Sequence, residues 1–492
     1  MTHHPVILLL TSALHFTAFI LVTLHCLQRR RNASATILWI FVAWSFPIIG
    51  PLIYLGFGVD RVNDRANLKF LADRRVLKAR NTISDVVSCA YWNDLADAHA
   101  PAANELEQSV NSIFDALLPD HPALAGNRID PLLTGDEAYP EMLAAIRGAT
   151  DHIHLQSFII GNDAVSREFI DALTAKAAEG VQVRLLYDRF GSTSALFGGL
   201  FRRARKTPGF KVAGWTQANP FKRQFQINLR NHRKVLVVDG TVGFFGGINI
   251  SAKNRTAPGV EPIRDYHFRV EGPLVQELQF AFMRDWYFIT REPPDKLLAR
   301  NFFPPIVKAG DIAARLVNSG PASIESLAAE TFFNCTVLAK EQILAVTPYF
   351  VPNADLLRAL RSAALRGVDV RLIVPKDNNH RYVKYASRAL YDELLSAGVR
   401  IFERHPPFMH AKAFIIDGHC SIVGTANLDV RSLHLNYETC AAVYSTSFAD
   451  RMKLIIHEDL DCSDEILQPD WQKRPRATRL LENFASLLTP VL

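Results

Sequence analysis

The sequence predicts an α/β protein made of two duplicated halves, preceded by an N-terminal transmembrane helical hairpin. Three observations support this fold class. One spaced pattern of polar residues occurs twice, an alternation of amphipathic helix and apolar strand also occurs twice, and two long uncharged segments open the chain. Because the repeated pattern keeps the same internal register, the halves are expected to pack together and build one site at their interface.

The N-terminal hairpin, residues 1–59, is predicted from the two uncharged segments. No Asp, Glu, Lys or Arg occurs in residues 1–28 or 32–59, and each window exceeds the roughly 20 residues that span a bilayer. Three arginines between the windows and the lack of a small-residue cleavage site favour two membrane helices over a signal peptide. Pro47 and Pro51 are expected to kink the second helix. Buried helices of a soluble protein are the alternative.

A mixed-charge helical connector is expected next to the membrane, over residues 60–124. Six lysines or arginines occur in the twenty residues after Val59, against three in the short loop of the hairpin. Because positively charged flanks favour the cytoplasmic side, this balance weakly favours a cytoplasmic position for the remainder of the chain. The sequence indicates no function for the connector.

Two α/β halves are predicted over residues 125–300 and 301–465, followed by a C-terminal tail, 466–492. The run that begins at Phe169 combines an amphipathic helix, a glycine stop and a buried apolar strand, and the run that begins at Leu356 repeats this order. Such alternation predicts parallel strands in each half. In the first half, the basic and aromatic stretch 201–230 is either a solvated loop or a membrane-facing patch.

Composition limits the class of protein only loosely. With 492 residues, 49% of them hydrophobic and 21% charged, the chain can bury a large core. The net charge of +6 suits an anionic membrane surface as well as nucleic acid. The six cysteines contain no CxxC pair, so neither a zinc site nor a disulfide framework is expected.

The duplicated pattern carries the strongest functional information. The first copy comprises His232, Lys234, Asp239, Gly246, Gly247 and Asn249, and the second comprises His410, Lys412, Asp417, Gly424, Thr425 and Asn427. Every spacing is identical, and the copies are offset by 178 residues. A match of this length, made twice in one register, favours duplication over coincidence.

A β-hairpin explains the spacing. Apolar runs that end in Asp-Gly predict a strand and a turn, and residues i and i+2 of a strand share a face. A two-residue turn at Asp239-Gly240 would place His232 opposite Gly247, with Asn249 just beyond the histidine. The second copy predicts the same arrangement. Each copy is therefore expected to present an imidazole, an ammonium group and a carboxamide on one patch.

These groups suit phosphate chemistry. Ammonium and amide donors match the oxygens of a phosphodiester, while one histidine can attack phosphorus and the other can protonate the leaving alcohol. The alternative is that each histidine only makes a hydrogen bond in the core and each lysine is a solvated surface charge. Two copies in matched register disfavour this alternative. Asp239 and Asp417 lie at the turns, where a structural role is favoured over acid–base chemistry. Since no cluster has metal-ligand spacing, neither a metal nor another cofactor is expected.

The sequence resembles the phospholipase D superfamily, whose HxKx4D signature occurs twice per active site. Over most of residues 125–465 it is similar to bacterial cardiolipin synthases, in segments such as LRNHRKVLVVDG and GTANLDVRSLHLNYE. The resemblance implies two phospholipase D-like α/β halves with the active site between them and no metal. It also implies transfer of a phosphatidyl group from one phosphatidylglycerol to another at the bacterial inner membrane, giving cardiolipin and glycerol through a covalent phosphohistidine.

The resemblance also implies roles for individual residues. The catalytic set would be His232, Lys234, Asp239, His410, Lys412 and Asp417, with Asn249 and Asn427 as substrate-binding residues. Asp265 and Glu438 would each be the acidic partner of the histidine about thirty residues upstream in its own half, and would orient that histidine. We expect His232 to attack phosphorus and His410 to act as general acid and then base. The near-symmetric repeats leave the reverse order open.

Three positions depart from the family pattern, and several rival functions remain open. Gln156 stands where Glu is expected, Pro407 where glycine is usual, and Asn379-His380 where an Asp-His pair is common. The expected partners are phosphatidylglycerol and anionic membrane lipids, with no nucleic acid. The rivals are a phospholipase D hydrolase, a transferase using phosphatidylethanolamine, a nuclease, and a non-catalytic membrane scaffold. The oligomeric state is not predicted.

Overall fold

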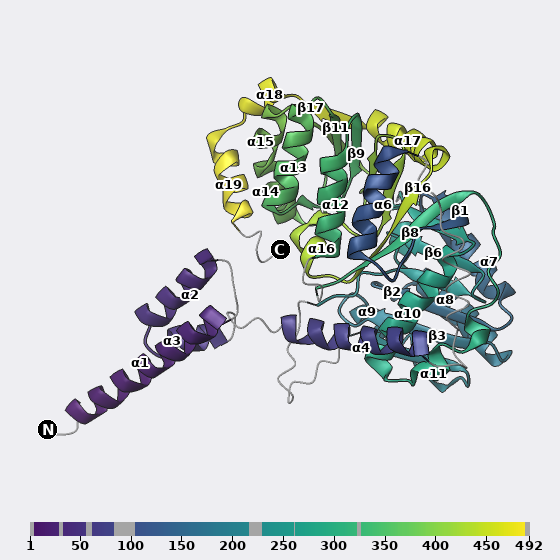
Figure 1. Ribbon diagram of the computed structural model, residues 1–492, viewed down its shortest axis with the longest axis horizontal. Coiled ribbons are helices and arrows are strands. Elements are labelled where there is room, and N and C mark those ends of the chain that lie inside the picture. Colours follow the sequence, from purple (N-terminus) through teal and green to yellow (C-terminus); the bar gives the residue numbers. More distant parts are fainter. Residues whose placement is uncertain are drawn as a thin grey trace. The chain divides into compact units, whose positions relative to one another are not determined.

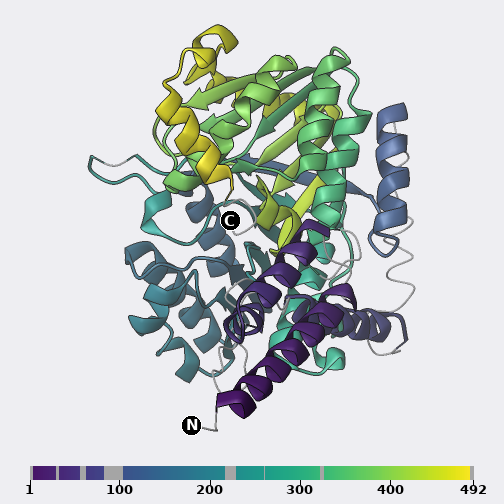
Figure 2. The ribbon, with the colours of Figure 1, turned by 90° about the vertical axis from the view of Figure 1, so that its left-hand side faces the viewer.

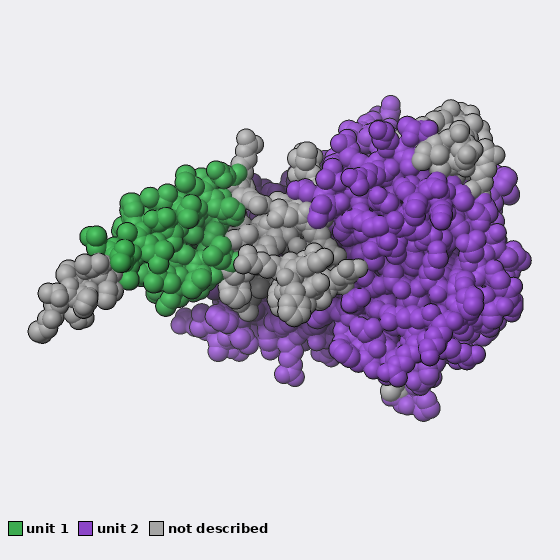
Figure 3. Space-filling view, turned by 90° about the horizontal axis from the view of Figure 1, so that it is seen from below, with its two compact units in different colours: residues 1–65 green, residues 66–492 purple. Residues whose placement is uncertain are grey.

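The computed structural model describes residues 4–28, 33–55, 62–82, 104–215, 229–259, 261–321 and 326–487. The chain divides into two compact units, residues 1–65 and 66–492, which Figure 3 shows in different colours. The larger unit contains both copies of the repeated pattern.

The smaller unit contains one helix long and apolar enough to cross a membrane, over Leu9–Gln28 of α1 (His4–Gln28). The structure does not support a second continuous spanning helix among the described residues. Instead α2 (Ala33–Ser45) is 13 residues long and is followed by the short α3 (Ile49–Ile53). Helix α2 ends just before Pro47, which lacks a backbone N–H, and Ile48 adopts a positive φ of 64°.

The chain reverses direction after α2. Near the middle of α1, a ring nitrogen of His15 lies 3.1 Å from the carbonyl oxygen of Trp44 at the end of α2. In the last turn of α1, His25 Nδ1 lies 2.5 Å from the hydroxyl oxygen of Tyr54, just after α3. Helices α1 and α2 therefore lie side by side (Figure 2), and α3 returns toward the end of α1.

The described part of the connector forms two helices, α4 (Val62–Thr82) and α6 (Glu105–Leu117), and residues 83–103 lie outside the described residues. From Ala66 onward, α4 belongs to the larger unit. The first turn of α6 begins at Asn104, whose side chain accepts a hydrogen bond from the N–H of Glu107. The connector thus contributes helices to the larger unit.

The first half alternates strands and helices as the sequence predicts (Figure 1). Its elements are β1 (Leu124–Leu132), α7 (Gly135–Gly148), β2 (His152–Ser157), α8 (Ala164–Ala178), β3 (Gln182–Asp188), α9 (Thr193–Phe197), β4 (Phe210–Trp215), β5 (Val235–Val238), β6 (Val242–Gly246), β7 (His267–Glu271), α10 (Leu274–Thr290) and α11 (Pro294–Leu297). Short 3₁₀ helices occur at η2 (Ala204–Lys206), η4 (Ala252–Asn254) and η5 (Arg300–Phe302).

The second half repeats this order and continues into the tail. Its elements are β8 (Ile312–Ser319), α12 (Leu327–Leu338), β9 (Gln342–Val346), β10 (Phe350–Val351), α13 (Ala354–Leu365), β11 (Asp369–Pro375), α14 (Arg381–Ala389), α15 (Tyr391–Ser396), β12 (Arg400–Arg404), β13 (Ala413–Ile416), β14 (Cys420–Gly424), β15 (Leu428–Asp429), α16 (Val430–His434), β16 (Glu438–Tyr444), α17 (Thr446–Asp461), β17 (Ser463–Ile466), α18 (Gln468–Gln472) and α19 (Arg476–Ser486).

One sheet runs through both halves. Its order is β17-β12-β11-β9-β13-β14-β16-β8-β1-β7-β6-β5-β2-β3-β4, and β8 and β1 pair antiparallel at the junction. Strands β2, β3 and β4 are parallel, as are β9, β11 and β12, which confirms the predicted parallel strands. The small sheet β10-β15 is separate.

The signature hairpins form, but the predicted register is wrong by one residue. Val238 pairs with Val242 and Ile416 pairs with Cys420, so each turn contains three residues instead of two. Asp239 and Asp417 both adopt a φ of 50° and the glycine after each is also left-handed, which is the backbone of a tight type I′ turn. The N–H of the next residue, Thr241 or His419, closes this turn, and that residue shifts the strand pairing by one position. Strand β5 begins at Val235, so His232 and Lys234 lie in the segment that enters the hairpin.

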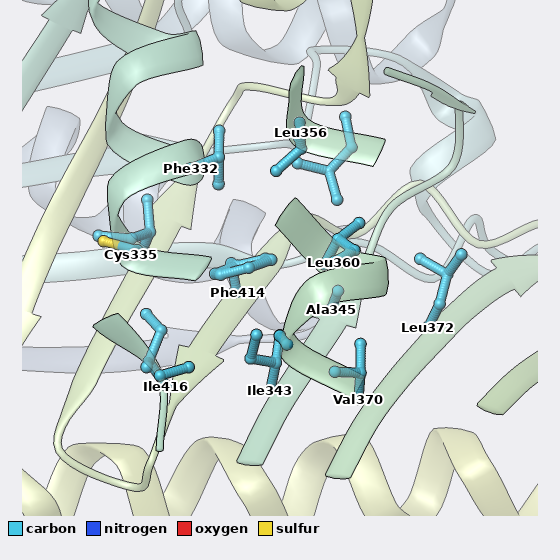
Figure 4. Packing of buried hydrophobic residues seen from close by; sticks show 14 of the residues in the cluster. Phe332, Cys335, Ile343, Ala345, Leu356, Leu360, Val370, Leu372, Phe414 and Ile416 are labelled. Atoms are coloured by element: carbon cyan, nitrogen blue, oxygen red, sulfur yellow. The ribbon is translucent and has the colours of Figure 1, made fainter. Parts of the chain in front are cut away.

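The core lies on both faces of the sheet because successive strand residues point in opposite directions. In β9, Ile343 and Ala345 pack beneath α12 and α13, with Phe332 and Leu360 among their neighbours, as Figure 4 shows. Leu344 instead joins a cluster on the opposite face. That second cluster includes Leu278 of α10 and Met452 of α17, so the two halves share one core.

The basic stretch 201–230 is described only in part. Its first section forms η2 and β4, whereas residues 216–228 lie outside the described residues. The membrane-facing patch therefore stays a prediction.

Candidate active site

Each histidine of the repeated pattern is held by the backbone of the other half. The N–H of His232 donates to the carbonyl oxygen of Tyr437 at 2.9 Å, and the N–H of His410 donates to that of Arg264 at 2.7 Å. Tyr437 directly precedes Glu438, and Arg264 directly precedes Asp265. The backbone bonds therefore bring each histidine to the acid of the opposite half.

The histidine–acid pairs are crossed, which corrects the expectation that each acid serves its own half. His410 Nδ1 lies 2.7 Å from Asp265 Oδ2, and His232 Nδ1 lies 3.2 Å from Glu438 Oε1. The correction has a geometric cause. Within a half, the acid begins or precedes the strand beside the hairpin, and only the opposing half brings a histidine to its open side.

The carboxylates fix the ring orientation of both histidines. Each carboxylate accepts a hydrogen bond from Nδ1–H, so the lone pair of Nε2 remains on the other side of the ring. The acids are buried, at 1% exposure for the side chain of Asp265 and 0% for Glu438, whereas the His232 and His410 side chains are 22% and 20% exposed. Each ring can therefore be approached by a substrate on the side away from its acid.

Both signature lysines reach into the same charged cluster. Lys234 Nζ donates to the carbonyl oxygen of His232 at 2.6 Å, and Lys412 Nζ donates to that of His410. Lys412 Nζ also lies 2.8 Å from His410 Nδ1. Since an ammonium group cannot accept a hydrogen bond, Nδ1–H of His410 donates to Asp265 and the lysine donates to the carbonyl oxygen.

The electrostatics link the two halves into one site. Burial and then the Lys412 ammonium lower the pKa of His410 to about 4, and Lys234 from the other half adds to the same effect. Burial lowers the pKa of Lys412 to about 7 and also lowers that of Lys234. The Lys234 ammonium adds to the lowering of the Lys412 pKa, so the two buried ammonium groups repel one another, and a bound phosphate anion would relieve this repulsion.

The acids remain ionised despite their burial. Burial opposes ionisation of Asp265, but Lys412 and His410 lower its pKa below the usual value. His232 and Lys234 likewise lower the pKa of Glu438 against the effect of burial. Each acid is thus a carboxylate that accepts a hydrogen bond, as an orienting partner must be.

The carboxamides of the two copies have different partners. Asn249 Oδ1 accepts a hydrogen bond from the N–H of Ile159 at 3.0 Å, which fixes the amide and leaves its NH2 end for other use. Asn427 Nδ2 donates to Ser432 Oγ at 3.2 Å, and its Oδ1 is buried without a partner among the described residues. The two asparagines are therefore not equivalent.

Asp239 and Asp417 lie at the turns and bind backbone N–H groups. Asp239 accepts from the N–H groups of residues 150, 151 and 152 at 2.8, 2.9 and 2.9 Å. Asp417 repeats this with residues 340, 341 and 342 at 2.9, 2.8 and 2.9 Å. Each aspartate therefore ties its hairpin to the start of the neighbouring antiparallel strand, β2 or β9.

The departures from the family pattern have defined contacts. Gln156 Nε2 donates to Asp285 Oδ2 at 2.9 Å inside the core. The carbonyl oxygen of Pro407 accepts from Arg404 at 3.0 Å, and the Pro406-Pro407 peptide is cis. Asn379 Oδ1 accepts from the hydroxyl of Tyr349 at 2.9 Å, a role that an aspartate could also fill.

Sequence reasoning missed neighbours of the histidines. Asn436 Nδ2 donates to Glu438 Oε1 at 3.2 Å and lies 3.3 Å from His232 Nδ1. Its position two residues before a buried acid was a usable signal, since i and i+2 share a strand face. The rings of Phe158 and Tyr349 lie 4.2 and 6.1 Å from those of His232 and His410, and no sequence signal marked them.

The fold and the site together define a phospholipase D-like protein. It has two α/β halves on one sheet, two histidine–carboxylate pairs and two lysines in one cluster. The crystal structure of phosphatidylserine synthase from Haemophilus influenzae shares this fold, with a TM-score of 0.60 at 15% identity over 79% of this chain and 100% of that chain.

Sequence comparison then identifies the family. A family model described as "Cardiolipin synthase, PLD-like domain" matches residues 142–286 and 336–460, and one described as "Phospholipase_D-nuclease N-terminal" matches residues 17–58. The chain is 34% identical to a cardiolipin synthase of Geobacillus kaustophilus over 490 residues, covering 98% of this chain and 94% of that protein. It is 33% identical to cardiolipin synthase A of Pseudomonas putida over 474 residues, covering 96% of each.

The chain belongs to the cardiolipin synthase family. This membership confirms the resemblance seen in the sequence and the predicted enzyme class, a phosphatidyltransferase. Among the described residues no group of three or more His, Cys, Asp or Glu side chains could hold a metal ion. Whether activity is independent of metal stays a prediction.

Proposed function

We propose that this chain makes cardiolipin by moving a phosphatidyl group from one phosphatidylglycerol to a hydroxyl of a second, with release of glycerol. The crossed histidine–acid pairs carry this proposal. They orient two imidazoles from opposite halves beside two buried lysines. A two-step displacement at phosphorus needs such a nucleophile and such a general acid–base.

In the first step, Nε2 of His232 attacks phosphorus of the donor, and the bond from phosphorus to the glycerol oxygen breaks. Glu438 holds the Nδ1 proton and stabilises the positive charge that develops on the ring. His410 gives a proton to the departing oxygen, so glycerol leaves neutral and a phosphohistidine remains. The ring of Phe158 against His232 restricts the direction of attack.

His410 must be protonated before it can act as an acid. In the free protein its pKa is lowered to about 4, chiefly by burial and next by Lys412, so the ring is neutral at neutral pH. A phosphodiester anion between the lysines offsets the charge of Lys412 and raises this pKa. Substrate binding would therefore favour the protonated form of His410, which can act as the general acid.

In the second step, His410, now neutral, removes the proton from a hydroxyl of the acceptor phosphatidylglycerol. The resulting oxygen attacks phosphorus, the bond from phosphorus to His232 breaks, and cardiolipin is released. Lys234, Lys412 and the NH2 group of Asn249 would donate to the phosphate oxygens throughout. Asn427, Asp239 and Asp417 would support this arrangement, the aspartates by fixing the hairpins.

We further propose that the enzyme works at the inner membrane of a bacterial cell, attached by its N-terminal unit and with the catalytic unit on the cytoplasmic side. The apolar α1 supports membrane attachment, and the basic residues after the hairpin support the orientation. Phosphatidylglycerol and other anionic lipids would be its partners, and nucleic acid would not.

Labelled donor lipid tests the assignment of the histidines. Folded His232→Ala and His410→Ala variants are incubated with a donor labelled in the retained phosphatidyl group and quenched in alkali, where phosphohistidine survives. Label is expected on peptides containing His232 in the His410→Ala variant and nowhere in the His232→Ala variant. Label on His410 would reverse the assignment, and an active enzyme that never carries label would favour direct transfer.

The lipid content of cells tests the substrate. A bacterial strain that lacks cardiolipin synthesis is compared with and without this gene. Cardiolipin is expected to appear together with glycerol release. Phosphatidic acid in its place would identify a hydrolase, and dependence on phosphatidylethanolamine would identify a different donor.

A further inference from the structure

A buried aspartate on α10 joins four side chains behind the His232 segment. Asp285 has no exposed side-chain surface, and both of its oxygens are occupied. Oδ1 accepts from Arg233 Nη1 at 2.8 Å and lies 3.1 Å from Lys69 Nζ. Oδ2 accepts from the amide groups of Gln156 and Asn231, each at 2.9 Å.

Two of these partners flank His232 in the sequence. Asn231 Oδ1 accepts from the N–H of Arg233 at 3.1 Å, which folds the chain around the histidine. Arg233 Nε then donates to the carbonyl oxygen of Glu438 at 3.2 Å. Asp285 therefore holds the segment that carries His232 and, through Arg233, the backbone of the acid that orients it.

The fourth partner comes from the connector. Lys69 lies in α4, and its side chain is 2% exposed. Besides Asp285 it forms an ion pair with Asp73 one turn further along the helix. Its Nζ lies 5.8 and 5.9 Å from the ring centres of Phe288 and Tyr437, and the Tyr437 carbonyl oxygen accepts from the N–H of His232.

The rest of α4 holds Lys69 in place. Ala66, Lys69, Val76 and Arg80 are buried, at the spacing of one helix face. Arg80 lies 4.8 Å from the ring centre of Phe280, so α4 meets α10 at both ends of this face (Figure 1).

Lys69 completes the charge balance of a cluster in which Asp73 is partly exposed and the other charged side chains are buried. Asp285 and Asp73 are negative, Arg233 and Lys69 are positive, and Gln156 is neutral where the family pattern led us to expect a carboxylate. Arg233 and then Lys69 lower the pKa of Asp285 against the effect of burial. Loss of one cation would leave a buried carboxylate without enough positive charge around it. Such a carboxylate moves toward solvent or takes up a proton.

We propose that Lys69 is a positioning residue for the catalytic site, which makes α4 part of the catalytic machinery and not only a link to the membrane unit. Lys69 fixes Asp285, Asp285 fixes Asn231 and Arg233, and these place His232 against Glu438. The inference rests on the proposed role of His232 as a reacting group, whether as nucleophile or as acid.

The test uses the full-length protein in lipid–detergent micelles and measures kcat and KM for cardiolipin formation. Lys69→Met keeps the apolar stem and removes the charge. It is expected to lower kcat by about 10–100-fold with KM within about threefold, because a small misplacement of a reacting group affects the reaction more than binding. Lys78→Met, on the exposed side of the same helix, is the matched control and should keep the wild-type kcat.

A double-mutant cycle separates positioning from general loss of structure. If Lys69 acts through Asp285, the Lys69→Met/Asp285→Asn variant should be no slower than Asp285→Asn alone, because the second change removes nothing further. Lys69→Arg should recover most of kcat. Multiplicative losses in the double variant, or wild-type kcat in folded Lys69→Met, would overturn the proposal.

Two further measurements distinguish failure of the Lys69 proposal from misfolding of a variant and from failure of the proposed function. Should Lys69→Met fail to fold, Lys69→Gln, which retains a hydrogen-bond donor and removes only the charge, is measured with the same expectations. Release of p-nitrophenol from a p-nitrophenyl phosphodiester reports on the site independently of the natural substrate. A wild type that releases p-nitrophenol but makes no cardiolipin would contradict the proposed function and leave the Lys69 comparison measurable.

Discussion

The two histidine–acid pairs of this enzyme derive from one repeated pattern, yet they differ in geometry. His410 lies 2.7 Å from Asp265, and the histidine is the only side chain hydrogen-bonded to Oδ2 of that acid among the described residues. His232 lies 3.2 Å from Glu438, whose Oε1 also accepts from Asn436 at 3.2 Å. The distance in the His410–Asp265 pair is shorter, and the acid oxygen has no second side-chain partner among the described residues. The distance in the His232–Glu438 pair is longer, and Asn436 shares the acid oxygen. We call these the exclusive pair and the shared pair.

One position of the pattern accounts for part of this difference. A Cβ added to Gly247 would lie 1.9 Å from Asp265 Oδ1, so glycine is needed for the acid to sit where it does. The equivalent residue in the other half is Thr425, whose hydroxyl donates to Glu438 Oε2 at 2.6 Å. Duplicated halves can thus keep the same reacting groups while a neighbouring residue gives each acid a different environment.

Removal of either histidine should have the largest effect and should distinguish the two. We expect His232→Ala and His410→Ala each to lower kcat for cardiolipin formation by about 10³-fold or more. With a p-nitrophenyl donor, whose leaving group needs no proton, His410→Ala should recover a burst of p-nitrophenol and His232→Ala should not. The exposed His457→Ala is the control, and a burst from His232→Ala alone would reverse the roles.

Neutralising the acids should separate the exclusive pair from the shared pair. Asp265→Asn is expected to lower kcat by about 100-fold and Glu438→Gln by about 10-fold, within the range found when a group that orients a histidine is lost. Asn436 and Thr425 still hold the residue at position 438, which limits the second loss. Steady-state kinetics with the surface variant Asp450→Asn as control measure this, and equal losses would contradict the comparison.

Substitution of Gly247 and of its counterpart Thr425 should lower kcat by smaller amounts, and by different amounts at the two positions. Gly247→Ala is expected to lower kcat by about 10–100-fold, because Asp265 must move to make room for the methyl group. Thr425→Val removes one hydrogen bond to Glu438 and should cost about 10-fold or less. The control is Gly148→Ala, where an added Cβ meets nothing within 4 Å. A larger loss for Thr425→Val would show that the Glu438 pair is the more sensitive one.

Chelation should have the smallest effect, since each half supplies its own cation, Lys234 or Lys412. We expect kcat to stay within about twofold of its untreated value in EDTA, because lysines in place of a metal would stabilise the phosphate charge. Activity is measured in neutral detergent, so that divalent ions do not alter the charge of the lipid surface. Complete loss that a divalent ion restores would contradict a site built from two lysines.

Much of the fold followed from the sequence because its signals are local. The helix and strand after Phe169 and those after Leu356 form α8–β3 and α13–β11, with parallel strands as predicted. The hairpins also form, although their register differs by one residue. The left-handed Asp-Gly pairs form tight turns, but the pairs did not reveal that the next residue, Thr241 or His419, would stay outside the paired positions.

The predicted second membrane helix shows that composition was insufficient to predict a continuous helix. An uncharged window of 28 residues, 32–59, met the length criterion, but helix continuity also depends on prolines and on local packing. The chain instead breaks between Ser45 and Ile49, and Tyr54 returns to His25 of α1. Hydropathy records the solvent that a segment prefers, and it does not record the path of the backbone.

By itself the sequence predicted which residues react, because His232, Lys234, His410 and Lys412 recur at fixed spacing. The tertiary structure decided how they are paired. Only packing of the halves brings Asp265 to His410 and Glu438 to His232, and only burial makes Lys69 of α4 a partner of Asp285. The physical reason is that spacing along a strand fixes the face on which a residue lies, whereas contacts across an interface depend on how two surfaces fit.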